Sequence, residues 1–199
     1  MATQTKPFLT PEQYLEIERQ AEFKSVYYQG EMFAMAGARE VHVTIVGNLF
    51  AQLHQQVRAR PCRAWVADLR VRVSPELYTY PDVVVVCGEP QFLNDTRDTL
   101  LNPNLIVEVL SPYTEAYDRG LKFEHYRSLP SVSQYLTVAS DRVSAERFTR
   151  QPSGAWLLTA VSHLEDSLEL ESVGCRLALA DVYEKVDLTQ TASMVRPLS

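Results

Sequence analysis

The stretch Tyr80-Pro81-Asp82-Val83-Val84-Val85-Val86-Cys87-Gly88 decides the fold, because it joins a fully apolar run to a carboxylate at its start. Every residue from 83 to 86 is β-branched, which is typical of a strand buried on both faces of a sheet. Pro81 and Gly88 mark the two ends of this strand. Asp82 is therefore expected at the mouth of a buried strand, where it either ties down a turn or holds a ligand in a cleft.

A second apolar segment, Leu105 to Leu110 (LIVEVL), contains one carboxylate, Glu108. An ionised glutamate in such a strand is costly unless a cation, a proton or a metal ion compensates its charge. A buried ion pair with an arginine is one solution. A cation shared between Asp82 and Glu108 is the other, and Mg2+ prefers carboxylate oxygens while taking few protein ligands at once.

Lys122 is the only lysine between Lys24 and Lys185. Lysine carries a compact charge whose pKa can be tuned, whereas arginine provides fixed charge for phosphate contacts. Lys122 lies on the helix expected directly after the Glu108 strand, from which it can reach back over the end of the sheet. The alternative is a pair with Asp118, four residues earlier, on an exposed face of that helix.

The remaining pattern alternates helices and strands. Helices are expected at 10–20, 39–58, 111–129 and 181–184, single strands at 62–73, 80–87, 105–110, 134–138, 168–171 and 176–179, and hairpins at 23–36 and 145–161. This order predicts an α/β (α+β) fold with a mixed central β-sheet flanked by helices. We expect one domain over 1–199, with an N-terminal helix and hairpin (10–36), a core (39–139) and C-terminal hairpins (143–186).

Composition limits the classes of function. The chain has 199 residues, of which 46% are hydrophobic and 22% charged, as in an ordinary globular protein. Its net charge of -6 means that any nucleic-acid contact needs a local basic patch. The cluster Arg58, Arg60 and Arg63 lies at the expected end of helix 39–58, where the helix dipole already favours it.

Compartment and redox state follow from the absence of targeting patterns. No apolar run approaches the ~20 residues of a membrane span, and residues 1–10 contain no apolar core of a signal peptide. The cysteines Cys62, Cys87 and Cys175 are odd in number and lack CxxC spacing. We therefore expect a cytoplasmic protein with reduced thiols, with neither a disulfide framework nor a zinc site.

Seven motifs together resemble the Uma-type family of bacterial endonucleases, which has the restriction-endonuclease-like fold of the PD-(D/E)xK superfamily. They are 27–31 (YYQGE), 34–37 (AMAG), 68–71 (DLRV), 80–85 (YPDVVV), 102–103 (NP), 108–112 (EVLSP) and 117–127 (YDRGLKFEHYR). The resemblance runs from about Phe8 to Lys185. It implies a restriction-endonuclease-like core with a mixed sheet, flanking helices and additional N- and C-terminal hairpins.

The resemblance also implies a set of site residues. Asp82 and Glu108 would bind Mg2+ or Mn2+, and Lys122 would replace the lysine that the superfamily has two residues after the glutamate, where this chain has Leu110. Asp68 matches a further acidic position and is a candidate metal ligand, or else part of a solvated strand edge. The other candidates are the accessory residues His42 (which could instead cap or pack at its helix start) and Glu31, and the phosphate-binding residues Arg70, Arg72, Arg119 and Arg127.

The expected function is that of a Mg2+-dependent DNA endonuclease, which hydrolyses phosphodiester bonds and forms a homodimer. The alternative is a nuclease fold that has weakened or lost its activity and acts as a binding or regulatory scaffold. Val26 favours this alternative, because relatives often have an acidic residue there, and so do the apolar Val41 and Val43 around His42. The sequence contains no G-x-S-x-G, P-loop or H-E-x-x-H motif of another hydrolase class.

Overall fold

The computed structural model describes residues 8–189, so the ends of the predicted domain, 1–7 and 190–199, lie outside the described residues. Its centre is a six-stranded sheet in the order β11-β10-β9-β8-β6-β3. The strands are β3 (Cys62–Val66), β6 (Val83–Cys87), β8 (Leu105–Leu110), β9 (Gln134–Ala139), β10 (Ala145–Arg150) and β11 (Trp156–Val161). β8 and β9 run parallel and the other neighbours antiparallel, which confirms the predicted mixed central sheet.

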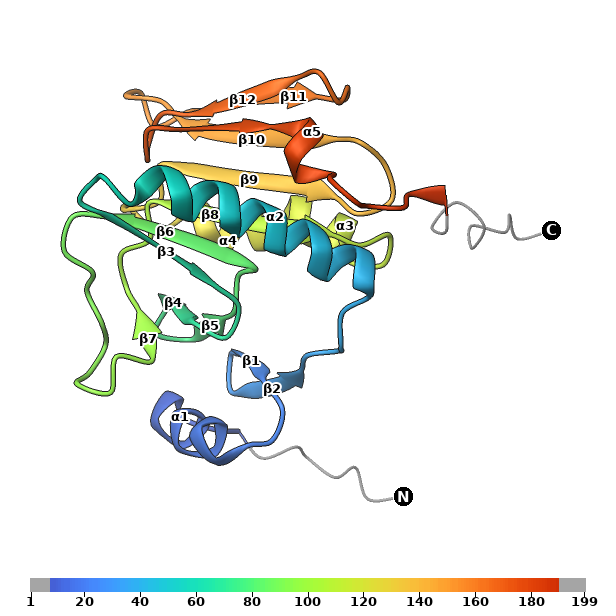
Figure 1. Cartoon of the computed structure of the whole chain (residues 1–199). Helices are drawn as coiled ribbons and strands as arrows, with labels where there is room; N and C mark the ends of the chain where they lie inside the picture. The colour runs from blue at the N-terminus through green and yellow to red at the C-terminus, as the bar shows by residue number, and fades with distance from the viewer. Residues whose placement is uncertain (1–7, 190–199) are drawn as a thin grey trace.

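A second sheet lies between the main sheet and helix α1 (Pro11–Gln20) (Figure 1). It has five strands in the order β2-β1-β5-β4-β7, namely β1 (Ser25–Tyr28), β2 (Glu31–Ala34), β4 (Arg70–Ser74), β5 (Leu77–Thr79) and β7 (Thr99–Leu100). A capping box begins α1, since Gln13 N–H donates to the Thr10 side chain and the Gln13 side chain accepts from Thr10 N–H. Stacked rings of Tyr14 and Tyr27 join α1 to the sheet.

The prediction of one strand over 62–73 was wrong. Ala67 and Asp68 adopt positive φ angles of 36° and 56°, so the chain leaves the main sheet after β3 and enters the second sheet at β4. Arg70, a candidate phosphate-binding residue, begins β4 and is only 3% exposed. The alternation of polar and apolar residues in the sequence continues through the break, and periodicity therefore cannot reveal it.

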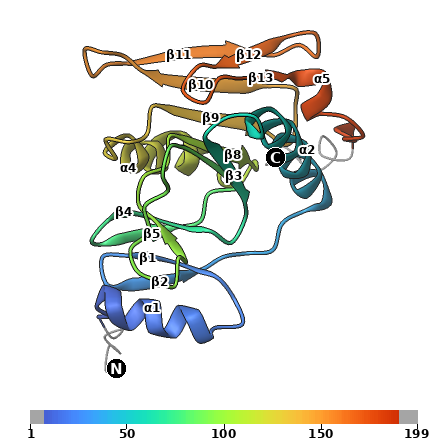
Figure 2. The same ribbon diagram turned by 60° about the vertical axis from the view of Figure 1, so that its left-hand side comes forward.

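The two faces of the main sheet are covered differently. Helix α2 (Glu40–Val57) packs on one face together with β12 (Ser167–Leu170), β13 (Cys175–Ala178) and α5 (Leu179–Val182). On the opposite side of β8 lies the helical segment made of α3 (Glu115–Tyr117), the π-helical turn η1 (Asp118–Lys122) and α4 (Phe123–Arg127) (Figure 2). Within residues 8–189, no helix combines the length and the apolar character that crossing a membrane requires.

The helix predicted over 111–129 is shorter and less regular. Ser111 and Pro112 form a turn, in which the Ser111 and Thr114 hydroxyls are 3.1 Å apart, and the helix starts at Glu115. Its middle widens into the π-helical turn at Asp118–Lys122. Single π turns inside α-helices occur frequently at functional sites.

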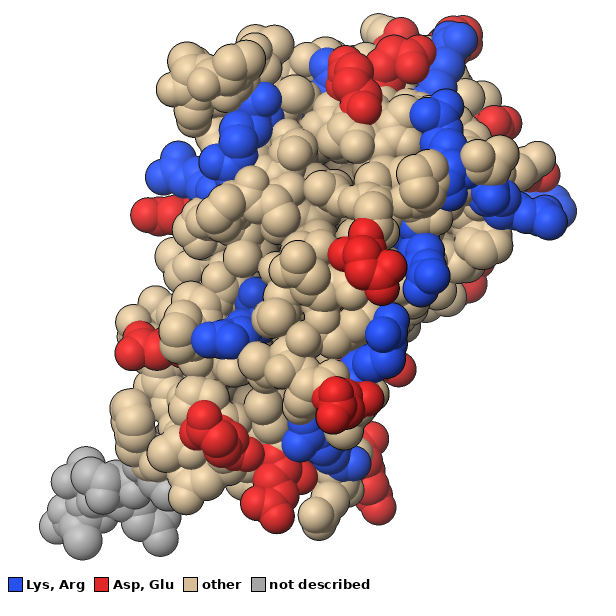
Figure 3. Space-filling view, turned by 90° about the vertical axis from the view of Figure 1, so that its left-hand side faces the viewer, with Lys and Arg blue, Asp and Glu red and all other residues tan. Residues whose placement is uncertain are grey.

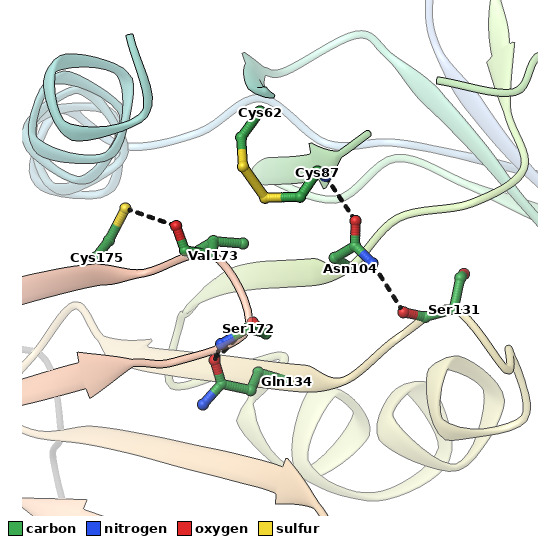
Figure 4. Close-up of a disulfide and its surroundings, with 8 residues drawn as sticks. All are labelled: Cys62, Cys87, Asn104, Ser131, Gln134, Ser172, Val173 and Cys175. Atoms are coloured by element: carbon green, nitrogen blue, oxygen red, sulfur yellow. Dashed lines mark hydrogen bonds between the residues drawn. A yellow bond between two sulfur atoms is a disulfide. The ribbon is translucent and has the colours of Figure 1, made fainter. Parts of the chain in front are cut away.

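The prediction that all cysteines are reduced was also wrong. Cys62 and Cys87 form a disulfide between β3 and β6, and Cys175 is buried with a free thiol (Figure 4). The two bonded residues are direct partners in the antiparallel ladder, with Cα atoms 3.9 Å apart. The two cysteines are 25 positions apart in sequence, and the segment between them contains no indication of this pairing, because strand register depends on the tertiary fold.

Candidate active site

Asp82 lies beside Glu108 because of the register between β6 and β8. Val83 pairs with Val107 in this antiparallel ladder. Asp82, which precedes Val83, therefore lies next to Glu108, which follows Val107. The Asp82 Oδ2 atom accepts a hydrogen bond from Val109 N–H at 2.7 Å, and its Oδ1 atom is 3.1 Å from His42 Nε2. Asp82 thus fixes the strand end and also lines the site.

Lys122 provides the buried cation for Glu108, where the sequence had suggested an arginine. Its Nζ atom is 2.8 Å from Glu108 Oε2 and 3.2 Å from Asp118 Oδ1. The pair with Asp118 exists, but on an inward face, since the Lys122 side chain is only 16% exposed. Tyr126 donates a hydrogen bond to Glu108 Oε1 at 3.0 Å. Both oxygens of Glu108 are therefore engaged by one helical segment.

The cluster carries more negative than positive groups. Burial raises the pKa of Glu108 to about 8; Lys122 opposes this rise, and the carboxylates of Asp82 and Asp118 add to it. Burial lowers the pKa of Lys122, but Glu108 and Asp118 outweigh burial and leave it above its ordinary value. One fixed ammonium thus faces three carboxyl groups, a distribution that favours either a proton or a further cation.

The donor set suits a hard divalent cation. Asp82 and Glu108 offer carboxylate oxygens from adjacent strands, and the surplus negative charge would be offset by the ion. No group of three or more His, Cys, Asp or Glu side chains within residues 8–189 is arranged to bind a metal. Mg2+ usually keeps several waters and takes one or two carboxylates, so two side chains are a sufficient set.

Two other acidic candidates lie outside this cluster. Asp68 is exposed in the link between β3 and β4; its neighbour Ala67 donates its N–H to the Asp82 carbonyl at 3.0 Å. Glu31 is exposed at the start of β2, where its backbone pairs with Tyr28. The structure thus brings Asp82, Glu108, Lys122 and His42 together, while Asp68 follows a residue that contacts the Asp82 backbone.

The four candidate phosphate-binding arginines have different environments. Arg70 is buried and donates to Tyr80 Oη and Thr99 Oγ1 at 3.1 and 3.0 Å. Arg72 is half-buried on β4, opposite Tyr78. Arg119 forms ion pairs with Glu115, at 2.8 Å, and with Glu146.

Arg127 differs from the other three arginines. It is exposed at the end of α4, where its guanidinium lies 5.9 Å from the centre of the Phe123 ring. It is thus the member of the set whose charge is open to a ligand.

Sequence reasoning missed two features of the site: Tyr126 as a donor to Glu108, and the inward position of Asp118, which had been expected to pair with Lys122 on an exposed helix face. A usable pattern exists, because Asp118, Lys122 and Tyr126 follow one another at intervals of four along the helical segment. Residues four apart lie on one helix face. An acid, a base and a phenol on one face next to a buried glutamate predict such a cluster.

Fold and site together define a protein with the restriction-endonuclease-like fold. The family model of Uma2, described as "putative restriction endonuclease", matches residues 11–180. The chain belongs to this family.

The chain is also similar to two relatives in sequence and to one solved structure. Two uncharacterized proteins of Synechocystis sp., slr1290 and sll1609, are 36% and 34% identical over 178 and 172 residues; these alignments cover 89% and 86% of this chain and 92% and 96% of the relatives. A crystal structure described as that of a "putative nuclease belonging to DUF820" from Anabaena variabilis superposes with a TM-score of 0.72 at 15% identity, covering 90% of this chain and 99% of that one. At this identity the match establishes the shared fold.

Proposed function

We propose that this protein is a metal-dependent endonuclease that hydrolyses phosphodiester bonds in DNA. The observation that carries the proposal is the position of Asp82 and Glu108 on neighbouring strands with the Lys122 ammonium 2.8 Å from Glu108. The descriptions of the Uma2 family as a restriction endonuclease and of the Anabaena protein as a nuclease support the nuclease part of this proposal.

Each residue of the cluster has a role in this proposal. Asp82 and Glu108 would hold Mg2+ or Mn2+, which supplies a Lewis acid for the phosphoryl oxygen and lowers the pKa of bound water. Lys122 would orient the attacking water or offset charge on the transition-state oxygens. His42 and Val109 N–H position the Asp82 carboxylate, and Tyr126 positions that of Glu108.

A second candidate, the non-catalytic scaffold, is favoured by a specific observation. Each carboxylate oxygen of Asp82 and Glu108 already has a protein partner, namely His42, Val109 N–H, Lys122 or Tyr126. A buried ion-pair network that satisfies itself can serve stability and specificity of the fold alone. Metal binding distinguishes the two candidates.

Calorimetric titration of Mn2+ and of Mg2+ into three proteins tests the proposal. The wild type should bind, the Asp82→Ala variant should not, and the Asp95→Ala variant should bind like the wild type, because Asp95 is an exposed loop residue. The same three proteins are then incubated with plasmid DNA and Mn2+. Cleavage that disappears only with Asp82→Ala supports the endonuclease; equal behaviour of all three proteins favours the scaffold.

Assembly and compartment stay predictions. The homodimer is tested by light scattering, where the mass of one 22.6 kDa chain would contradict it. The cytoplasmic location has to be reconciled with the Cys62–Cys87 disulfide, because such bonds are rare in a reducing cytosol. The face seen in Figure 3 intersperses basic with acidic side chains, so a nucleic acid would need a more local site of binding.

A further inference from the structure

A groove of about 670 Å3 lies along α4, between β1 and the β10–β11 hairpin. It lies on the same side of the main sheet as the helical segment of the candidate active site. Five side chains give the groove its chemistry: Tyr28, His125, Arg127, Arg150 and Trp156. Aromatic rings and guanidinium groups therefore line the same open depression.

The two arginines supply positive charge. Arg150 donates from Nε to Val132 O at 2.9 Å and from Nη2 to the carbonyls of Arg127 and Leu129 at 2.7 and 2.9 Å. These partners are neutral, so the guanidinium is held in place while its charge stays available. Arg127 is exposed, and its guanidinium contacts the face of Phe123. Glu124 is the one carboxylate among the lining residues.

The aromatic side chains supply flat surfaces. The rings of Tyr28 and His125 are 5.4 Å apart, and the Arg150 guanidinium lies 4.6 Å from the centre of the Trp156 ring. Burial lowers the pKa of His125, which keeps this ring neutral at neutral pH. Proteins that bind single-stranded nucleic acid combine such stacking surfaces with basic side chains that follow the backbone.

The groove is adjacent to the candidate active site. Leu121 and Glu124 line it, while Lys122, which lies between them in sequence, points inward to Glu108. The same short helical segment therefore lines the groove with Leu121 and Glu124 and reaches Glu108 with Lys122.

We propose that this groove binds unpaired nucleotides of the substrate strand next to the point of cleavage. Bases stack on Tyr28, His125 and Trp156, and phosphates lie at Arg127 and Arg150. The proposal rests on the proposed nuclease function and specifies its substrate as nucleic acid with a single-stranded segment. A flexible strand can enter such a groove base by base, whereas the stacked bases of an intact duplex cannot reach its aromatic walls.

Fluorescence anisotropy with a labelled thymidine dodecamer tests the groove independently of cleavage, because the titration is done in EDTA at low salt. The wild type should bind the single strand more tightly than a duplex of equal length. Trp156→Leu should weaken binding of the single strand about tenfold, as loss of one stacking surface does. Arg127→Gln should weaken it and reduce its salt dependence.

Matched controls separate the groove from general surface effects. Arg97→Gln removes an exposed arginine that lies 4.4 Å from the centre of the Phe92 ring, an environment like that of Arg127. Phe23→Leu removes an aromatic side chain that is 72% exposed elsewhere. Both variants should bind like the wild type, and binding that falls equally in controls and groove variants would overturn the proposal.

The fluorescence of Trp156 reports contact between this side chain and an oligonucleotide directly. The chain has two tryptophans, so Trp65→Phe leaves Trp156 as the only one. The thymidine dodecamer should quench its fluorescence, and a uridine dodecamer in a parallel titration distinguishes DNA from RNA. No quenching and no binding of either strand overturns the groove. Cleavage that survives Asp82→Ala would instead refute the nuclease site. The binding measurements on the groove would keep their meaning, because they do not depend on cleavage.

Discussion

Lys122 Nζ is shared by two buried carboxylates, that of Glu108 at 2.8 Å and that of Asp118 at 3.2 Å. The side chains of these acids are 4% and 6% exposed, so water contributes little to their stabilisation. One ammonium cannot neutralise two carboxylates and Asp82 as well. The excess of negative charge adds to burial in raising the pKa of Glu108 to about 8.

Replacing Lys122 with methionine should show how much the buried carboxylates of Glu108 and Asp118 depend on this ammonium. The variant buries Glu108 and Asp118 without their cation, which should lower the free energy of unfolding by about 3–5 kcal/mol. The double variant Lys122→Met, Glu108→Gln removes both charges and should recover part of that loss, yet neither protein should cleave DNA. Urea unfolding followed by circular dichroism measures the stability. Equal stability of Lys122→Met and the wild type would show that the lysine is not the counterion.

The raised pKa of Glu108 should make the stability of the fold depend on pH. Its pKa rises from 4.5 to about 8 on folding, so the native state keeps a proton that the unfolded state releases between these values. The stabilising contribution is full below pH 4.5 and is lost as pH rises through about 8. Urea unfolding of the wild type across this window should show that decline, and Glu108→Gln should lack it. Parallel curves for both proteins would refute the assignment.

His42 should act on the metal through Asp82. Its Nε2 atom is 3.1 Å from Asp82 Oδ1, a contact that fixes the orientation of the carboxylate. Partners of this kind typically alter metal affinity by about 10–100-fold when removed. We expect His42→Ala to weaken Mn2+ binding by a factor at the lower end of that range, as measured by calorimetry. His42→Gln should retain part of the wild-type affinity for Mn2+. Unchanged affinity in His42→Ala would mean that the contact is dispensable.

Arg70 and Arg127 should respond in opposite ways to substitution. Arg70 is buried among Tyr80, Thr99 and Asp98, so Arg70→Met should destabilise the fold by about 3 kcal/mol. Its affinity for DNA, measured on the folded protein, should not change. Arg127→Gln should leave thermal stability unchanged and weaken nucleic-acid binding. A loss of affinity confined to Arg70→Met would place the phosphate contacts in the second sheet instead.

Reduction of the Cys62–Cys87 bond should lower stability without changing the fold. The bond closes a loop of 25 residues, and loops of this length correspond to roughly 3 kcal/mol of restricted chain entropy in the unfolded state. The Cys62→Ser, Cys87→Ser double variant should melt at a lower temperature than the oxidised wild type and should match the reduced one. Identical melting in the presence and absence of dithiothreitol would indicate that the bond does not form in solution.

The sequence predicted those elements that depend on local pattern. The valine run after Asp82 and the aliphatic strand around Glu108 each specify a buried strand, and the stripe along 39–58 specifies α2, because hydrophobic periodicity reflects burial directly. The isolated Lys122 pointed to a specific role, and the structure places it on Glu108. The mixed sheet followed from the order of these elements.

Features that depend on how the strands align in the tertiary fold could not be predicted from the sequence. The break at Ala67 and Asp68 preserves the alternation of polar and apolar residues, so nothing local shows that the chain changes sheets. Cys62 and Cys87 meet only because β3 and β6 align in one of several possible registers. Arg70 looked like a surface cation because the polar network around it comes from residues distant in sequence.

The change of sheets at Ala67 places Asp82 at the boundary between the two sheets. The chain passes between the two sheets twice at this point, once from β3 to β4 and once from β5 to β6, and the Ala67 N–H donates to the Asp82 carbonyl at 3.0 Å. At this boundary the link between the sheets holds the Asp82 backbone, while Val109 N–H of β8 holds its carboxylate at 2.7 Å. The spacing of the Asp82 and Glu108 carboxylates is therefore set by both sheets, and a substitution in the link at Ala67 can change the site without touching either acid.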